Sequence, residues 1–296
     1  MSRAIADALA YVRPTFMLPA VGMSAYGALL APAAAFDLRV AALHAVAVGV
    51  ALFVAHLRDG LVDGHVREEE DPRLSVAAFR WGIRAGVALG TALAAGLSVV
   101  AGPLAGASIA GLLALALLHA PYLDRHPVTV TVDYPAGIAL GIVGGYAAQS
   151  AAPSPGVVAV AALFFGLLAG IKVGIDALDA DFDRSIDKRT VPVALGPRRA
   201  DRVAGGIFGL VTLGTLGVAA AGTVGALGVD APFVLAAALG PLGCLAATAL
   251  TGGERTVRLQ MGLTYVFAGF LFFGACVGRC AGAALVSRAL GAVGIA

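Results

Sequence analysis

The fold is decided by the stretch AALFFGLLAGIKVGI, residues 161–175, and by DALDADFDRSIDKRTVPVALG, residues 176–196, which follows it at once. The first stretch is apolar over almost its whole length, whereas the second holds five aspartates, one lysine and two arginines. About 20 apolar residues in a helix cross the hydrocarbon core of a membrane. The junction therefore predicts a membrane span that ends in a dense polar cluster.

The whole chain has the composition of a membrane protein. Of its 296 residues, 59% are hydrophobic and 13% are charged, against about 25% charged in a soluble domain. The apolar runs are continuous rather than alternating, and lipid offers backbone groups no partner, so helices are favoured over a barrel. We expect an all-α integral membrane protein with nine transmembrane helices, near 14–35, 38–57, 82–102, 104–120, 134–152, 156–178, 202–226, 231–250 and 259–286.

The positions of the cations predict the orientation. With nine spans, nearly all Lys and Arg residues fall on one side, in or beside the segments 1–13, 58–81, 121–133, 179–201 and 251–258. By the positive-inside rule, we expect the N-terminus and this charged face to be cytoplasmic. The formal net charge is only +2, and no basic surface for nucleic acid is indicated.

Two acidic clusters occupy equivalent places along the chain. HLRDGLVDGHVREEEDP, residues 56–72, leaves the second predicted span, and residues 176–190 leave the sixth. Four predicted helices separate the two clusters, which favours a duplicated four-helix unit. We expect one polytopic domain over residues 1–296, with this pseudo-repeat inside it.

The second cluster has helical spacing. Asp179, Asp183 and Asp187 recur every four residues, so on a continuing helix their carboxylates would share one face. Like charges so placed destabilise one another unless a cation lies between them. Asp176 and Lys172 precede this row near the same face, and a lysine inside a span usually faces an acidic partner or a cavity.

The two clusters together could hold magnesium. Asp59 and Asp63 repeat the four-residue spacing in the first cluster. Mg²⁺ uses few carboxylates directly and often completes its shell with phosphate oxygens, so a diphosphate is the natural third partner. Basic side chains could take the remaining phosphate charge; the candidates are Arg67, Arg125, Lys188 and Arg189. Charge runs after a span are also commonly solvated loops, which would explain Glu68–Asp71 and Arg198–Arg202.

These motifs resemble those of the UbiA superfamily of intramembrane prenyltransferases. DADFDRSIDKRTVPVALG, residues 179–196, resembles the second aspartate-rich motif of that family, DxxxDxxxD followed by a basic pair, a threonine and a proline. DGHV, residues 63–66, resembles the tail of the first motif, NDxxDxxxD, with Ala55 and His56 at the Asn and first Asp positions. PYLDRHP, residues 121–127, resembles a loop that carries a tyrosine and a basic residue.

The resemblance implies a nine-helix bundle around a central cavity and a set of site residues. The implied reaction is Mg²⁺-dependent ionisation of an isoprenyl diphosphate and transfer of the prenyl group to a lipophilic acceptor within the membrane. The catalytic residues would be Asp59, Asp63, Asp179, Asp183 and Lys172; the Mg²⁺ ligands Asp59, Asp63, Asp179, Asp183 and Asp187; and the diphosphate-binding residues Arg67, Lys188, Arg189, Tyr122 and Arg125.

The altered first motif leaves other functions open. Ala55 and His56 suggest a weakened or rearranged first metal site, which Glu68–Asp71 could compensate. A UbiA-type terpene cyclase would ionise the same kind of diphosphate and capture the cation internally, without an acceptor. A cation transporter would need polar groups through the full bilayer depth, and the far half of each span is nearly uncharged. A binding protein that has lost its catalytic activity is the remaining alternative.

Two smaller patterns concern packing. Gly137, Gly141 and Gly145 are spaced by four, as are three glycines from Gly166 to Gly174, and such stripes let helices approach closely in lipid. Cys276 and Cys280 lie one helical turn apart in the last predicted span, where we expect ordinary buried thiols.

Overall fold

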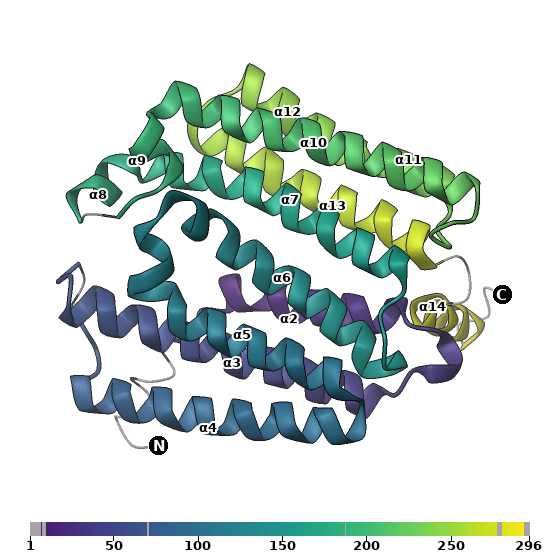
Figure 1. The fold of residues 1–296 in the computed structure, drawn as a ribbon, viewed down its shortest axis with the longest axis horizontal. Helices are drawn as coiled ribbons and strands as arrows, with labels where there is room; N and C mark the ends of the chain where they lie inside the picture. Colours follow the sequence, from purple (N-terminus) through teal and green to yellow (C-terminus); the bar gives the residue numbers. More distant parts are fainter. Residues whose placement is uncertain (1–6, 8–9, 70, 187, 277–279, 293–296) are drawn as a thin grey trace.

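The computed structural model describes residues 7, 10–69, 71–186, 188–276 and 280–292 (Figure 1). This part of the chain is almost entirely helical, with a single β-bridge between Pro32 and Cys280. The predicted all-α class is therefore confirmed. The long helices lie side by side in a layered bundle that runs from α4 at one edge to α10 and α12 at the other (Figure 1).

The helices follow one another through short connections. In chain order they are α2 (Pro14–Leu30), η1 (Ala33–Ala35), α3 (Leu38–His65), α4 (Val76–Val100), α5 (Pro103–Tyr122), η2 (Leu123–Arg125), α6 (Pro127–Ser150), α7 (Pro155–Leu178), α8 (Ala180–Ser185), α9 (Val191–Leu195), α10 (Pro197–Thr223), α11 (Ala231–Ala237), α12 (Leu239–Leu250), α13 (Gly253–Cys276) and α14 (Ala281–Ala292).

The membrane spans agree with the predicted ones from the second to the ninth. Within the described residues, eight helical segments are long and apolar enough to cross a membrane, which indicates a multi-pass membrane protein. The first predicted span corresponds to α2, which has only 17 residues, so a count of nine is not confirmed. The central cavity, the four-helix duplication and the cytoplasmic orientation stay predictions.

Local sequence signals set several helix starts. The Asp37 side chain accepts hydrogen bonds from the backbone N–H groups of Arg39 at 2.7 Å and Val40 at 3.3 Å, which satisfies donors that the helix leaves free. Proline stands at or next to the first position of α5, α6, α7 and α10, where its missing N–H costs nothing. Gly196 precedes α10 with a φ of 79°, a conformation that glycine adopts without strain.

Close approach of helices explains the glycine spacing. A Cβ added to Gly145 would meet the carbonyl oxygen of Ser24 well inside van der Waals contact, and one on Gly27 would meet that of Ile142 in the same way. In these positions α2 and α6 touch backbone to backbone. A Cβ on Gly170 would lie 2.6 Å from the Phe208 ring, so α7 and α10 also pack tightly, as the stripes predicted.

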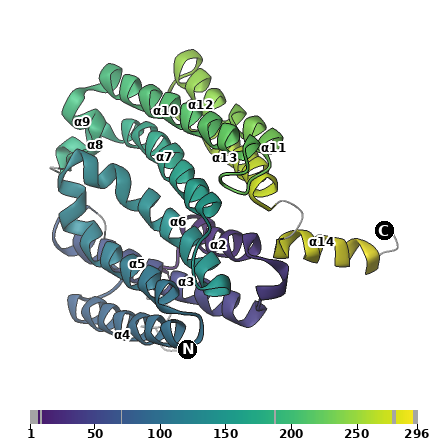
Figure 2. The same cartoon turned by 45° about the vertical axis from the view of Figure 1, so that its right-hand side comes forward.

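The end of the chain differs from the prediction. The expected span over 259–286 ends at Cys276, and α14 begins at Ala281 and leads away from the bundle (Figure 2). The expectation of free thiols was wrong for this pair, because Cys276 and Cys280 form a disulfide. A continuous run of apolar residues does not reveal where one helix ends and another begins, because α13 and α14 are both largely apolar.

Candidate functional site

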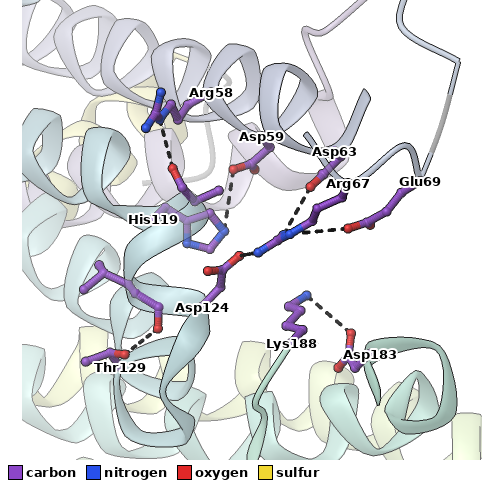
Figure 3. Close-up of polar contacts among 12 residues, drawn as sticks. Arg58, Asp59, Asp63, Arg67, Glu69, His119, Asp124, Thr129, Asp183 and Lys188 are labelled. Atoms are coloured by element: carbon purple, nitrogen blue, oxygen red, sulfur yellow. Dashed lines mark hydrogen bonds and ion pairs between the residues drawn. The ribbon is translucent and has the colours of Figure 1, made fainter. Parts of the chain in front are cut away.

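The polar segments gather at one end of the bundle. The C-terminal end of α3, the turn η2 and the short helices α8 and α9 all lie there, at the left in Figure 1. The main-chain N–H of Arg189, beyond α8, donates to the carbonyl oxygen of Asp124 in η2 at 3.4 Å. This contact joins the second acidic cluster to the α5–α6 connection, and Figure 3 shows the side chains that meet around it.

Arg67 holds three carboxylates together. Its guanidinium lies 3.4 Å from Asp63 and 3.7 Å from Glu69, and it also pairs with Asp124 (Figure 3). Burial would lower the pKa of Arg67, but Asp124, Asp63 and Glu69 outweigh that effect and raise it. Burial and the neighbouring Asp63 raise the pKa of Glu69, against the opposing effect of Arg67. The environment therefore favours the charge on the arginine and disfavours the one on Glu69.

Asp124 is a site residue that sequence reasoning missed. It lies in η2 between the two residues predicted from the family loop, and it is only 2% exposed. Tyr122 and Arg125, in contrast, are exposed. A single acid in a loop carries no spacing pattern, and the only signal that could have marked it was its place inside PYLDRHP.

Asp59 faces a histidine that the prediction also omitted. Its carboxylate lies 3.8 Å from Nε2 of His119 (Figure 3). The Nδ1 of His119 contacts the buried Asp133. Asp133 in turn accepts a hydrogen bond from the backbone N–H of Tyr134 at 2.6 Å. Asp133 fixes the position of the imidazole, which lies between Asp133 and Asp59. Asp59 is itself one helical turn from Asp63 in α3.

The second motif is not the continuous helical row that its spacing predicted. The helix is interrupted at Asp179, which separates α7 from the six-residue α8, and Asp179 is exposed. Asp183 is 3% exposed and lies 3.5 Å from Lys188. Asp187 lies outside the described residues. The backbone N–H of Asp183 donates to the carbonyl oxygen of Asp179 at 2.8 Å, so these two residues stay one helical turn apart. The row is interrupted at its start, between α7 and α8.

Lys172 meets the acidic partner that its place in a span predicted. It pairs with Asp176 one turn later in α7, and Asp176 is 4% exposed. Lys188 lies beyond this pair. Burial would lower the pKa of Lys188, but Asp183 and Asp176 outweigh that effect and raise it. Lys172 and Lys188 are thus each held against a buried carboxylate.

Two of the five predicted phosphate-binding residues share one hollow at this end of the bundle. A hollow of about 320 Å³ is lined by Lys188 and Arg189, together with Arg184 and Val193. Three cations around one hollow make it suited to an anion. Of the acidic run after α3, Glu69 contacts Arg67, whereas Glu68 and Asp71 are exposed.

The donor set fits magnesium, although its members are not gathered tightly. Among the described residues, no group of three His, Cys, Asp or Glu side chains lies close enough to hold a metal. Buried carboxylate oxygens nevertheless lack a hydrogen-bond partner on Asp59, Glu69, Asp124 and Asp176. Carboxylate oxygens are the ligands that Mg²⁺ prefers, together with water and phosphate oxygens. The unpartnered oxygens are therefore suited to a hard cation.

The bundle and its polar end have the UbiA fold, as comparison with solved structures shows. A UbiA homologue from Archaeoglobus fulgidus bound to GPP and Mg²⁺ is 17% identical, with a TM-score of 0.70 over 92% of this chain and 99% of that one. A UbiA homologue from Aeropyrum pernix is 21% identical, with a TM-score of 0.63 over 88% and 98%. A digeranylgeranylglyceryl phosphate synthase is 13% identical, with a TM-score of 0.68 over 93% and 100%.

These likenesses confirm the expected family resemblance at the level of the fold. No family model matches the sequence, and no curated protein matches it. The likeness is therefore one of helix arrangement, not of overall sequence identity.

Proposed function

We propose that this protein is a Mg²⁺-dependent membrane prenyltransferase of the UbiA type, which ionises an isoprenyl diphosphate and transfers the prenyl group to a lipophilic acceptor. One observation carries the proposal: buried carboxylates with unpartnered oxygens and several cations converge at one end of an apolar bundle. The solved UbiA homologues with GPP or DMAPP and Mg²⁺ support it.

The carboxylates would hold the metal, and the cations would hold the diphosphate. Asp59, Asp63 and Asp183 are the described members of the predicted metal set that lie against other charged side chains; Asp179 and Asp187 complete that set as predicted. Bound Mg²⁺ would neutralise the charge that develops on the departing diphosphate. Arg67, Lys188 and Arg189 would contact the remaining phosphate oxygens, with Tyr122 and Arg125 as further predicted contacts.

The apolar bundle would protect the carbocation. When the C–O bond breaks, the diphosphate leaves with the electron pair and the prenyl group becomes an allylic cation. Water would trap that cation, so a dry apolar surrounding is needed until the acceptor attacks. Helices α2, α6, α7 and α13 provide packed apolar and aromatic side chains deeper in the bundle, including Phe164 and Phe267, whose ring centroids are 5.3 Å apart.

Diphosphate release tests the proposal directly. Detergent-purified protein with geranylgeranyl diphosphate and Mg²⁺ should release diphosphate once a membrane lipid extract supplies an acceptor, and Asp183→Asn should abolish the release. Asp181→Asn is the matched control, because Asp181 is fully exposed and pairs only with Arg184 on the surface among the described contacts. Full activity in Asp183→Asn would contradict the assignment of the site.

The same assay separates transfer from cyclisation. The altered positions Ala55 and His56 favour keeping the cyclase as a second candidate, since they change the first acidic motif. Release of diphosphate without any acceptor, together with a cyclic lipid product by mass analysis, would establish cyclisation. Release that depends on the extract would favour transfer and would provide the acceptor for identification.

A further inference from the structure

Asp124 lies among the charged groups of both acidic clusters. Its carboxylate contacts Arg67 at the end of α3. It also acts electrostatically on Asp59 and Glu69 on one side, and on Lys188 on the other. The turn η2 thus places a buried carboxylate between the first and the second motif, although it belongs to neither.

The guanidinium of Arg67 marks a place where carboxylates surround a cation. Asp63 comes from α3, Glu69 from the loop after it and Asp124 from η2, and all three face the same guanidinium (Figure 3). Carboxylates from separate segments repel one another unless a cation lies among them. The fold has therefore built a cation-binding arrangement, which the side chain of Arg67 occupies.

An unpartnered oxygen is a second and independent sign of a ligand. Asp124 is 2% exposed, and its Oδ1 is buried without a hydrogen-bond partner in the described part of the chain. Among the described residues, the Oδ1 of Asp59 is also buried without a hydrogen bond, and Nε2 of His119 faces it at 3.8 Å. Leaving a charged oxygen buried without a hydrogen bond is costly. A divalent cation would remove that cost.

The first acidic motif lacks one carboxylate that Asp124 can replace. His56 stands where the resembling motif has its first aspartate, and it interacts with Tyr11 and Arg13 in the N-terminal segment. We propose that Asp124 is a direct Mg²⁺ ligand in this chain and that it joins Asp59 and Asp63 in the metal site only when the diphosphate binds, since the three carboxylates are not gathered around one point among the described residues. This inference rests on the proposed function.

The proposal also predicts how the pairing of Arg67 changes when the diphosphate binds. Without substrate, Arg67 neutralises Asp124 and keeps the carboxylates together. When a diphosphate enters, its oxygens compete for the guanidinium, which matches phosphate as well as carboxylate geometry. The Asp124 carboxylate is then released to the metal. Metal and diphosphate should therefore bind cooperatively, each more tightly in the presence of the other.

Binding of Mn²⁺, followed by its electron paramagnetic resonance signal, tests this assignment without catalysis. Full-length protein in detergent is titrated with Mn²⁺ in the presence of inorganic diphosphate. We expect Asp124→Asn to weaken Mn²⁺ binding at least about tenfold, the lower range for losing a group that supports a metal. The control Asp181→Asn should bind as the unchanged protein does. Asp124→Cys should shift the preference from Mn²⁺ toward Cd²⁺, because a thiolate favours the softer ion.

The outcomes separate this inference from the proposed function. Failure of the unchanged protein to bind Mn²⁺ with diphosphate would overturn both. Normal binding by Asp124→Asn would overturn only the role of Asp124. An effect of Asp124→Asn that vanishes in an Arg67→Gln background would show that Asp124 merely partners Arg67, and would overturn the inference as well. If the amide variant does not fold, unchanged metal preference in Asp124→Cys is the overturning result.

Discussion

Replacing Arg67 with glutamine should destabilise the protein more than removing any one of its acidic partners. In the folded protein the side chain of Arg67 is 15% exposed and that of Asp124 is 3% exposed. Arg67→Gln leaves Asp124 as a buried charge without its cation. Breaking a buried ion pair from one side costs about 3–5 kcal/mol. Because Arg67 retains some solvent contact, we take the lower end, about 3 kcal/mol.

The opposite variant should cost less, because Arg67 keeps two partners. In Asp124→Asn, Asp63 and Glu69 remain 3.4 and 3.7 Å from the guanidinium. The loss is then close to that of one charged hydrogen bond, about 1.5 kcal/mol. In the double variant no charge is left unpaired at position 124, so its stability should exceed that of Arg67→Gln alone.

Thermal unfolding in detergent measures this asymmetry. At about 2–4 °C per kcal/mol, Arg67→Gln should lower the midpoint by roughly 6–12 °C, and all variants are compared at one scan rate because unfolding of such proteins is often irreversible. Arg184→Gln is the control, since its pair with Asp181 is exposed and surface pairs contribute little. A smaller loss in Arg67→Gln than in Asp124→Asn, or a double variant less stable than either, would refute the reasoning.

Three further changes test other parts of the structure. The pKa of Glu69 is raised in the folded protein. The stability that this gives is present below the ordinary glutamate pKa, about 4.3, and is lost as the pH rises through the pKa of the folded protein. Glu69→Gln should therefore raise the melting midpoint at pH 7 and leave it unchanged near pH 4. Gly145→Ala should prevent stable folding. Gly206→Ala is the control and should fold, because an added Cβ there meets nothing within 4 Å. Equal yields of monodisperse protein from the two variants would contradict the α2–α6 contact. Replacing Cys276 and Cys280 by serine should lower the free energy of unfolding by about 2 kcal/mol, because the unfolded chain is no longer restricted by the disulfide. Diphosphate release should be unchanged. Loss of that release would show that the disulfide supports the distant site.

The class of the fold could be predicted from the sequence because one physical constraint dominates it. Continuous apolar runs have no stable alternative to helices in lipid, and the predicted spans from the second to the ninth each correspond to a helix of sufficient length. The sequence did not reveal that α13 ends at Cys276, because α14, which begins at Ala281, is also largely apolar. It also overestimated the first span, whose helix α2 ends at Leu30.

Sequence spacing could place candidate residues beside one another only within a single helix. Asp59 and Asp63 could be recognised because α3 continues to His65 and keeps both on neighbouring turns. After α7 the spacing did not describe one continuous helix, because the helix is interrupted at Asp179 and Asp183 belongs to the short α8. Lys172 could be paired with an acidic partner because both residues belong to one helix.

The sequence by itself determined that this is an all-α membrane protein with its acidic and basic groups on one face, since composition and local spacing are enough for that. The tertiary structure decided which of those groups meet. Asp124 contacts Arg67, His119 lies beside Asp59, and Asp133 contacts His119. The two members of each pair are 14 to 60 residues apart along the chain. No periodicity links such residues, because their distance in space is set by how helices pack and where the turns between them point.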